Sequence, residues 1–455
     1  MPVWSELVAA DKNVRAPRPT FTFDQSRHAG EPSREIGWEL IMSTRTTFAG
    51  LCGAVRRKAV TGSFITLFSM PLLGAPSSEQ VKLVSADTSF AFSLLKELAN
   101  EQPARNVFIS SYSISTVLQM VENGAAGNTR EEMARVLGTS DMETGAFNKA
   151  HKDLDASVRS AQADVSLTIA NAIWYSMGIE VKPAFAALNK DFYGASMDAL
   201  DFTDPRTGGI VNAWVDKNTG GKIKNIVAGR FPGDTRMVLA NAIYFKGKWQ
   251  RTFDAKLTKP RAFHSSENRE SQLLMMGQDG EFEYQEGNGC QAVRLPYKGR
   301  RLGMYVLLPE PGSSVAKLLG ALNSQVWQEQ LLRQMASRKG TIVLPRFKLE
   351  YGAVLNQSLK ALGMKLPFSS SADFSGMSSN PSYLSEVKHK SFVEVNEEGT
   401  EAAAATIAVM KAVSVRPETK PFEMVVDRPF LFVIADQVTK AILFLGIVID
   451  PASAN

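Results

Sequence analysis

Histidine and cysteine side chains supply most nucleophiles, general bases and metal ligands, and they are few in this chain of 455 residues. The sequence contains no HExxH, GxSxG, Walker A or CxxC pattern, so nothing indicates a zinc protease, a serine hydrolase, a phosphate-binding loop or a thiol pair. A Ser-His-Asp triad is not excluded by composition, but no spacing points to one. We therefore expect no enzyme, no metal ion and no cofactor. The side chains concerned are His28, His151, His264, His389, Cys52 and Cys290.

A different kind of chemistry is suggested by residues 397–406, where every side chain is small or acidic. Four consecutive alanines beside a glutamate favour a short helix, but a strand-like run precedes the segment and Arg416-Pro417 follows it. Side chains this small can enter a packed sheet with little steric penalty, so we expect this segment to be able to add to a sheet. Its residues are Glu397, Glu398, Gly399, Thr400, Glu401, Ala402, Ala403, Ala404, Ala405 and Thr406.

The composition is that of a globular protein, with 44% hydrophobic and 21% charged residues. The net charge is +5, and residues 1–75 hold nine basic and six acidic side chains, so they carry +3 of it. The rest of the chain has both signs interspersed and no basic block. We therefore expect no nucleic-acid partner.

The N-terminal region reads as a leader. Residues 1–41 are rich in Pro, Arg and Ser, and we interpret them as an unstructured or wrongly assigned extension before Met42. Residues 42–75 show a basic region, a short apolar core at 59–73 and a small-residue end, which is the order of a signal peptide. We expect a secreted or periplasmic protein with no membrane segment in its mature form. An intracellular protein with a disordered basic tail is the alternative.

The body of the chain, from about residue 84 onward, is regularly patterned without a linker. Apolar spacing predicts early helices, the first capped by Asp87, and the pair Thr129 and Glu132 predicts a capping box before a C-terminal Gly138. Helices first and strands later favour an α+β fold in one domain. Strand-like runs occupy residues 165–175, 237–245, 303–308, 341–347 and 392–395, and a hairpin occupies 429–434 and 441–449.

Ordered motifs then resemble one family. Besides the segment 397–406, they read NVFISSYSI at 106–114, GAAGNT at 124–129, NAWV at 212–215, LANAIYFKGKW at 239–249, LSEVKHK at 384–390 and DRPFLF at 427–432. In this order they are similar to the inhibitory serpins over residues 84–451, and we interpret the source as prokaryotic. One departure is Ser111, which stands where the family usually has proline.

The resemblance implies a serpin fold with three β-sheets, about eight or nine helices and an exposed reactive-centre loop at about 399–417. It carries the family's shutter residues over to Ser110, Ser113, Asn241 and His389. It also carries a salt bridge at the top of the central sheet over to Arg346 and Glu397. A satisfied core or surface contact is the ordinary alternative for each of these residues.

The resemblance also implies an inhibitor of serine endopeptidases, or of cysteine proteases, that acts as a monomeric suicide substrate. The target would cut the loop and stay acyl-linked while the loop inserts into the central sheet. The family's usual spacing from Glu397 places the cut between Val413 and Ser414, which favours an elastase-like or chymotrypsin-like target. Neighbouring bonds, Lys411 and Arg416 remain open as cut sites.

Two other functions stay open from the sequence. We call residues 397–406 the hinge. A non-inhibitory serpin, serving as carrier, chaperone or storage protein, would be expected to have a bulky, charged or proline-bearing hinge, which this chain lacks. A hydrolase with an undetected nucleophile is the alternative from another class.

Overall fold

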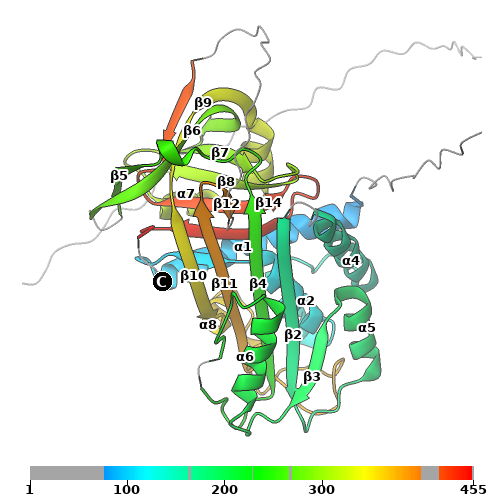
Figure 1. Ribbon diagram of the computed structural model, residues 1–455. Helices are drawn as coiled ribbons and strands as arrows, with labels where there is room; N and C mark the ends of the chain where they lie inside the picture. Colours follow the sequence, from blue (N-terminus) through cyan, green and yellow to red (C-terminus); the bar gives the residue numbers. More distant parts are fainter. Residues whose placement is uncertain (1–75, 162–164, 228, 266–268, 401–419, 453–455) are drawn as a thin grey trace, which may run out of the picture. The chain divides into compact units, whose positions relative to one another are not determined.

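The computed structural model describes residues 76–452, apart from 162–164, 228, 266–268 and 401–419 (Figure 1). These residues belong to one unit, Pro71–Asn455. The expected extension and signal peptide lie outside the described residues, as does most of the segment 397–406. The α+β class expected from the sequence is confirmed, because helices and strands alternate early and strands dominate later.

A six-stranded sheet forms the central layer of this unit (Figure 1). Its first four members, β10, β11, β12 and β4, are followed by β2 and β3 at the other edge. The strands in spatial order are β10 (Phe347–Val354), β11 (Glu386–Asn396), β12 (Gly399–Thr400), β4 (Met237–Lys248), β2 (Val165–Ser176) and β3 (Ser196–Leu200).

Strands β2 and β4 are the longest neighbours in this sheet, and both are buried on two faces. They pair antiparallel from Val165 opposite Gly247 to Tyr175 opposite Met237. Trp174 belongs to a cluster that α6 (Thr207–Asn218) covers, whereas Ile173 belongs to the main core on the other face. Burial on both faces explains why the sequences of these strands are almost continuously apolar.

A second sheet has nine strands, in the order β1-β15-β14-β8-β7-β6-β9-β13, with β5 paired to β6. The long strand β6 pairs with β5 near its start, with β9 in its middle and with β7 at its end. Because β6 joins these ladders, the described residues form two sheets, whereas the resemblance implied three. The bounds are β1 (Val107–Ile109), β5 (Lys259–His264), β6 (Glu270–Gly287), β7 (Cys290–Pro296), β8 (Leu302–Pro309), β9 (Ala336–Pro345), β13 (Phe422–Val425), β14 (Phe430–Asp436) and β15 (Ile442–Val448).

Helices cover the central sheet from two sides: α2 packs on β2 and β4 from the core side, and α6 crosses the opposite face (Figure 1). In the part of the chain that the structure describes, no helix is long and apolar enough to cross a membrane. The α-helices are α1 (Ser78–Glu101), α2 (Ser111–Glu122), α3 (Gly127–Leu137), α4 (Thr144–Ser160), α5 (Pro183–Tyr193), α6 (Thr207–Asn218), α7 (Val315–Ala321) and α8 (Asn356–Ala361). The shorter turns are η2 (Ala255–Leu257), η3 (Val326–Leu331), η4 (Leu332–Gln334) and η5 (Leu366–Phe368).

The first helix begins earlier than the sequence pattern suggested. Ser77 and Gln80 form a capping box at its N-terminus, because their side chains satisfy amide groups that the helix itself leaves free. The prediction that Asp87 caps this helix is therefore wrong. Asp87 lies inside the helix, where its carboxylate accepts a hydrogen bond of 3.0 Å from the Gln119 side chain.

The predicted capping box of α3 is also wrong, although the helix is present. Its N-cap, Ala126, has no side-chain cap, and the two polar side chains serve tertiary contacts instead. Thr129 Oγ1 accepts from the Asp373 amide at 2.9 Å, and Glu132 accepts from the Leu366 amide at 2.7 Å. The prediction of Gly138 at the C-terminal end is confirmed, since it adopts φ +72° at the cap.

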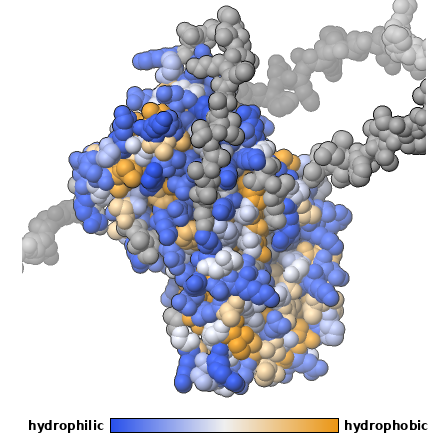
Figure 2. All heavy atoms as spheres, viewed as in Figure 1, coloured by the Kyte–Doolittle hydropathy of each residue, from blue (hydrophilic) through white to orange (hydrophobic). Residues whose placement is uncertain are grey.

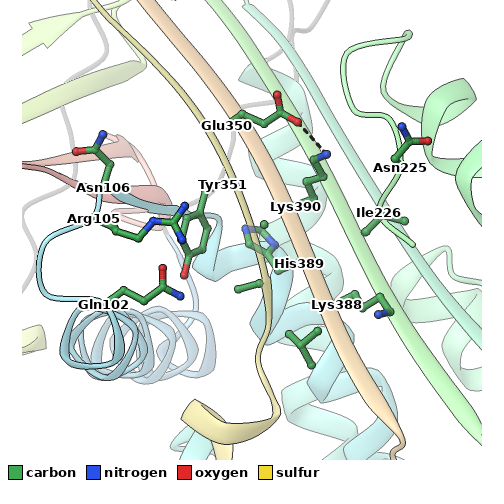
Figure 3. Close-up of a pocket in the computed structure, with 13 residues that line it drawn as sticks. Gln102, Arg105, Asn106, Asn225, Ile226, Glu350, Tyr351, Lys388, His389 and Lys390 are labelled. Atoms are coloured by element: carbon green, nitrogen blue, oxygen red, sulfur yellow. Dashed lines mark ion pairs between the residues drawn. The ribbon is translucent and has the colours of Figure 1, made fainter. Parts of the chain in front are cut away.

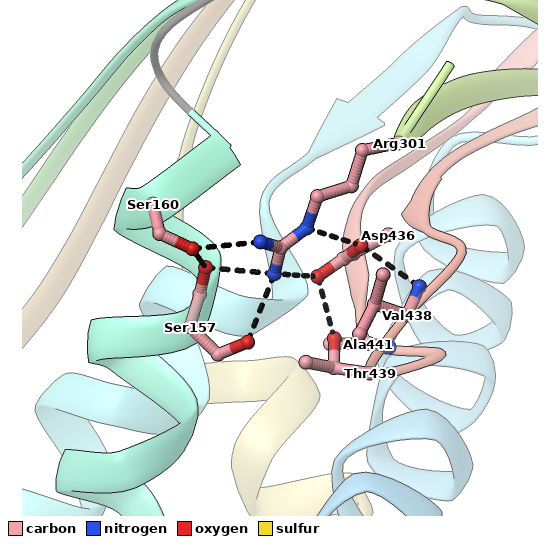
Figure 4. Close-up of polar contacts among 7 residues, drawn as sticks. All are labelled: Ser157, Ser160, Arg301, Asp436, Val438, Thr439 and Ala441. Carbon is pink, nitrogen blue, oxygen red and sulfur yellow. Dashed lines mark hydrogen bonds and ion pairs between the residues drawn. The ribbon is translucent and has the colours of Figure 1, made fainter. Parts of the chain in front are cut away.

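A buried ion pair connects α4 to the nine-stranded sheet (Figure 4). Arg301 donates to both carboxylate oxygens of Asp436, at 3.0 and 2.7 Å. The same guanidinium donates to Ser157 O and Ser160 Oγ at the end of α4, both at 2.7 Å. Because the Asp436 side chain is fully buried, this cluster ties the helix to the turn between β14 and β15.

On the face seen in Figure 2, hydrophobic residues form separate spots among hydrophilic ones. The large hydrophobic side chains that are exposed in the described residues belong to different elements and are Val81, Met177, Ile210, Leu257, Leu274, Val354 and Val438. Scattered apolar residues of this kind are normal on a protein surface.

Candidate functional site

The beginning of the small-residue segment lies inside the central sheet. Strand β12 consists of Gly399 and Thr400 and is held on both sides. Gly399 pairs with Asn396 of β11 and with Lys248 of β4, both antiparallel. Thr400 pairs with Val395 and Gly247 in the same way, and it is fully buried. Two residues of an added strand are therefore already present at one end of the sheet.

Beyond this point β11 and β4 are direct neighbours. They pair in parallel over seven residues, from Glu386 opposite Val238 to Phe392 opposite Tyr244. An antiparallel strand that continued from Thr400 would have to separate this parallel ladder. The sheet thus has a defined place where one more strand can enter.

Glycine is required at the first of the two inserted positions. Gly399 has φ +150°, and a Cβ on it would collide with the carbonyl oxygen of Gly247. At Gly247 a Cβ would lie 2.7 Å from the Tyr297 ring. The strands can approach this closely only because neither glycine carries a side chain.

An ion pair anchors the chain just before β12. Arg346, between β9 and β10, donates two hydrogen bonds to Glu397 Oε1, of which the Nε bond is 2.8 Å. Thr258 Oγ1 donates to the same oxygen at 2.5 Å. Burial disfavours ionisation of this carboxyl, but the bonds from Arg346 and Thr258 outweigh it and lower the pKa of Glu397.

Backbone contacts complete the anchoring. The Trp249 amide donates to Glu398 O and the Phe253 amide donates to Glu397 O, both at 2.8 Å. The Trp249 indole N–H donates to Asn396 O at 2.9 Å. Residues 396–398 are therefore fixed to the end of β4 through their carbonyl oxygens.

The residues predicted for the shutter are mostly brought together. His389 Nε2 accepts from the Ser110 amide at 3.3 Å, and Ser110 Oγ caps α2 by accepting from the Ser113 amide at 3.3 Å. Ser113 Oγ donates to Asn171 Oδ1 at 3.2 Å. Asn171 was not among the shutter residues that the resemblance implied. Burial lowers the pKa of His389 to about 3, so the ring is neutral at neutral pH.

Asn241 is placed by its backbone alone, since its side chain is outside the described residues. It lies opposite Asn171 in β2 and opposite His389 in β11. The two asparagines that interrupt apolar strands in the sequence are therefore direct partners in the ladder. Ser111 occupies the first turn of α2, where proline would also be tolerated.

A cavity of about 480 Å³ opens beside His389, between the end of α1 and strands β10 and β11 (Figure 3). Lys388 and Lys390 alternate with His389 along β11, so they lie on the opposite face of the strand. Lys390 pairs with Glu350 at 2.8 Å and Lys388 pairs with Glu386 at 3.0 Å. These pairs offset the charges of the two lysines, whereas Arg105 also lines the cavity.

Several predictions lie outside the described residues. They concern the residues after Thr400 and the expected cut, namely Glu401, Ala402, Ala403, Ala404, Ala405, Thr406, Val413 and Ser414. No group of His, Cys, Asp and Glu in the described part of the chain could hold a metal ion. Cys290 is buried with a free thiol, and burial raises its pKa to about 11, which makes it a poor nucleophile at neutral pH.

Comparison with known proteins gives the family. The model of the family Serpin (serine protease inhibitor) matches residues 85–451. The chain belongs to the serpin family. The resemblance seen in the sequence motifs is thereby confirmed, together with the α+β class of the fold that it implied.

Individual relatives cover most of this serpin. Bovine leukocyte elastase inhibitor is 37% identical over 383 residues, which is 81% of this chain and 100% of the relative. A serpin-like protein of Thermococcus kodakarensis is 37% identical over 377 residues, covering 82% of this chain and 87% of its own. Human thyroxine-binding globulin with bound thyroxine superposes with a TM-score of 0.76 at 26% identity, over 83% of this chain and 100% of that chain.

Proposed function

We propose that this serpin inhibits serine endopeptidases as a suicide substrate, by inserting its cleaved loop between β11 and β4. The observation that carries the proposal is the position of Gly399 and Thr400, which already pair with both strands. They set the direction and the register that an entering strand would follow. The name of the bovine elastase inhibitor supports an elastase-like target.

The register of β12 can be continued along the sheet one residue at a time. Residues 401–409 would then lie opposite residues 246–238 of β4 and residues 394–386 of β11. Because side chains alternate between the two faces, Ala402, Ala404 and Thr406 would share the buried side of Thr400. Glu401 would point to the other side, opposite Lys246, where it stays solvated.

The only hydroxyl on the buried side between residues 401 and 409 meets a polar region. In this register Thr406 would lie opposite both Asn241 and His389, at the level of the contacts of Ser110 and Ser113. Buried hydroxyls need hydrogen-bond partners, and this level of the core supplies them. The pattern of small and polar residues in the segment therefore fits the lining of the place that it would enter.

Insertion replaces one parallel ladder with two antiparallel ladders. Each added backbone hydrogen bond contributes about 0.5–1.5 kcal/mol net, and the alanine methyl groups become buried. The intact protein is then a kinetically trapped state, whose loop is released for insertion by cleavage.

The covalent step is an acyl transfer that stops at the acyl-enzyme intermediate. The serine oxygen of the protease bonds to the Val413 carbonyl carbon, and the bond from that carbon to the Ser414 nitrogen breaks. The nitrogen takes up the proton that the serine loses. Insertion from Thr400 to Val413 would move the linked protease roughly 45 Å, at about 3.3 Å per residue, before water hydrolyses the ester.

Incubation with pancreatic elastase tests the proposal on a denaturing gel, followed by mass spectrometry of the released C-terminal peptide. We expect an SDS-stable complex and a peptide that begins at Ser414, and no complex with elastase whose active-site serine is blocked. Val413→Asp should abolish the complex with elastase, because an apolar primary pocket rejects a charge. A complex with trypsin instead would indicate cleavage at Lys411 or Arg416.

A non-inhibitory carrier is the second candidate, favoured by the structural likeness to a globulin that binds thyroxine. It predicts clean cleavage by elastase without a complex. Turnover of a chromogenic ester by the serpin alone would contradict both candidates and favour a hydrolase.

We also propose that the mature protein is exported, after cleavage near residue 75. The supporting observation is that the first helix begins only at Ser78, directly after the small-residue end of the leader. N-terminal sequencing of the expressed protein tests this, and a mature start before residue 60 would contradict it.

A further inference from the structure

Among the described residues, Tyr297 makes the one side-chain hydrogen bond recorded for Thr400. Its hydroxyl lies 2.8 Å from Thr400 Oγ1, and both residues have no exposed surface. Tyr297 directly follows β7, in the nine-stranded sheet, whereas Thr400 is in the central sheet. The bond therefore connects the inserted part of the segment to the layer beneath it.

The tyrosine ring is held rigidly in its place. It stacks on Trp249 with ring centroids 4.7 Å apart, and it meets the Phe245 ring edge-on at 4.9 Å. Trp249 also pairs with Tyr297 through an isolated β-bridge, and Gly247 leaves room for the ring. The position of the hydroxyl is thus fixed by groups that do not belong to the hinge.

The buried Tyr297 hydroxyl has Thr400 as its recorded hydrogen-bond partner. Two aromatic rings pack against the Tyr297 ring, and burial raises the pKa of its hydroxyl far above the usual range, so the hydroxyl stays protonated. Within the described residues, the hydrogen bond recorded for each of the two hydroxyls is the one to the other. A shift of the hinge by one residue would leave both buried without a partner, which is costly.

We propose that Tyr297 is a positioning residue that pins the register of the hinge before the loop is cut. The inference rests on the proposed function, since it concerns the strand that is expected to enter. A slip of one residue turns every side chain of a strand to the opposite face. Here it would put Glu401 on the buried side, where an unpaired carboxylate strongly opposes insertion.

Hydrogen–deuterium exchange of the intact protein tests this role of Tyr297 without any protease. Tyr297→Phe keeps the aromatic stack and removes the hydroxyl, and Thr400→Val removes the other hydroxyl. We expect the amides of residues 396–400 to exchange about 2- to 12-fold faster in either variant, which corresponds to the loss of one hydrogen bond. The double variant should exchange no faster than the single variants, because both remove the same contact.

Two variants serve as matched controls. Tyr305→Phe removes a hydroxyl from another buried tyrosine in β8, so its hinge should exchange like that of the parent protein. Thr400→Ser keeps the hydroxyl and should also behave like the parent. The proposed role of Tyr297 would be overturned if the hinge amides exchanged equally fast in Tyr297→Phe and Tyr305→Phe. Additive effects in the double variant would overturn it as well.

Inhibition supplies the second measurement. In Tyr297→Phe the rate of encounter with elastase should stay within about twofold of the parent's rate, because the cut site is remote. More serpin molecules should, however, be cleaved per protease trapped than in the parent. If Tyr297 had a merely structural role, Tyr297→Phe would lower thermal stability without raising the number of serpin molecules cleaved per protease trapped above that of Tyr305→Phe. That result would contradict the proposal. If the parent protein traps no protease, the proposed function fails, while the exchange experiment still decides whether the contact fixes the hinge.

Discussion

Arg346 and Glu397 join the start of the hinge to the connection between β9 and β10. Both Nε and Nη2 of the arginine donate to one carboxylate oxygen, and the glutamate side chain is largely buried while the arginine is partly exposed. The pair therefore holds the point at which β11 turns back into β12. Its charge state should control how firmly the hinge stays in the sheet.

Glu397→Gln should loosen the hinge without unfolding the protein. A neutral amide oxygen accepts more weakly from the guanidinium, and partial exposure of Arg346 limits the loss of stability to about 1 kcal/mol. The folded pKa of Glu397 is lowered, so in the parent protein this contribution is present above the unfolded pKa and lost as pH falls through the folded pKa. Protection factors of the amides of residues 396–400, which are corrected for the intrinsic pH dependence of exchange, should fall between pH 7 and a pH below 4 in the parent and not in the variant. Glu329→Gln, which removes a surface pair with Arg333, should leave that pH response intact.

Thr400→Arg should convert the inhibitor into a substrate. Thr400 is fully buried against Tyr297, so an arginine there would have to be desolvated for the strand to enter. On a denaturing gel with elastase, the complex band should disappear and cleaved serpin should accumulate. Val438→Arg, at an exposed position of the turn after β14, should still form the complex. Inhibition that survives Thr400→Arg would contradict the insertion mechanism.

Sequence motifs predicted the family and the fold class, because those features are encoded locally, whereas the shutter roles stay predictions. For example, the sequence IANAIWY around Asn171 is similar to LANAIYF around Asn241, and the two strands that contain them are ladder partners. The role of Tyr297 could not be found in this way, since it is far from Thr400 in the sequence and no spacing connects them. Only the packing of one sheet on the other brings their hydroxyls together.

The errors at helix ends have a common physical cause. Asp87, Thr129 and Glu132 are residues that often cap helices, but tertiary partners compete for their side chains. Thr129 and Glu132 instead satisfy backbone amides near residues 366 and 373. The number of sheets differed for another reason, because one continuous strand, β6, pairs with β5, β9 and β7.

Asp87→Asn should make the folded state more stable at high pH. Burial raises the pKa of Asp87 to about 7, so the native state retains a proton that the unfolded chain loses above pH 4. The stability of the parent therefore falls as pH rises from about 4 to about 7 through this group. The variant should gain on the order of 2 kcal/mol over the parent at pH 8 and little at pH 4.5, measured by urea unfolding. Asp153→Asn, which alters only an exposed ion pair, should show no such pH-dependent difference.

Arg301→Ala should be strongly destabilising, because it leaves the buried Asp436 carboxylate without its charge partner (Figure 4). Removing one member of a buried pair costs about 3–5 kcal/mol, and the end of α4 also loses its bonds through Ser157 and Ser160. Arg333→Ala breaks an exposed pair and should cost under about 1 kcal/mol. Thermal unfolding of the two variants compares these costs, and equal shifts would contradict the structural importance of the cluster.

Gly399→Ala should expel the hinge from the sheet. The added Cβ would meet the carbonyl oxygen of Gly247 in β4, which belongs to the backbone and cannot rotate away. Gly312→Ala is the matched control, because Gly312 also has a positive φ, +80°, but nothing lies within 4 Å of its Cβ position. Both variants carry backbone strain, so the difference between them isolates the collision. We expect residues 396–400 to exchange at least tenfold faster in Gly399→Ala, as for a contact worth about 1.4 kcal/mol or more, and unchanged exchange there in Gly312→Ala. A hinge that stays protected in both variants would mean that β4 can move aside, and entry of the loop would then not depend on the close approach of Gly399 and Gly247.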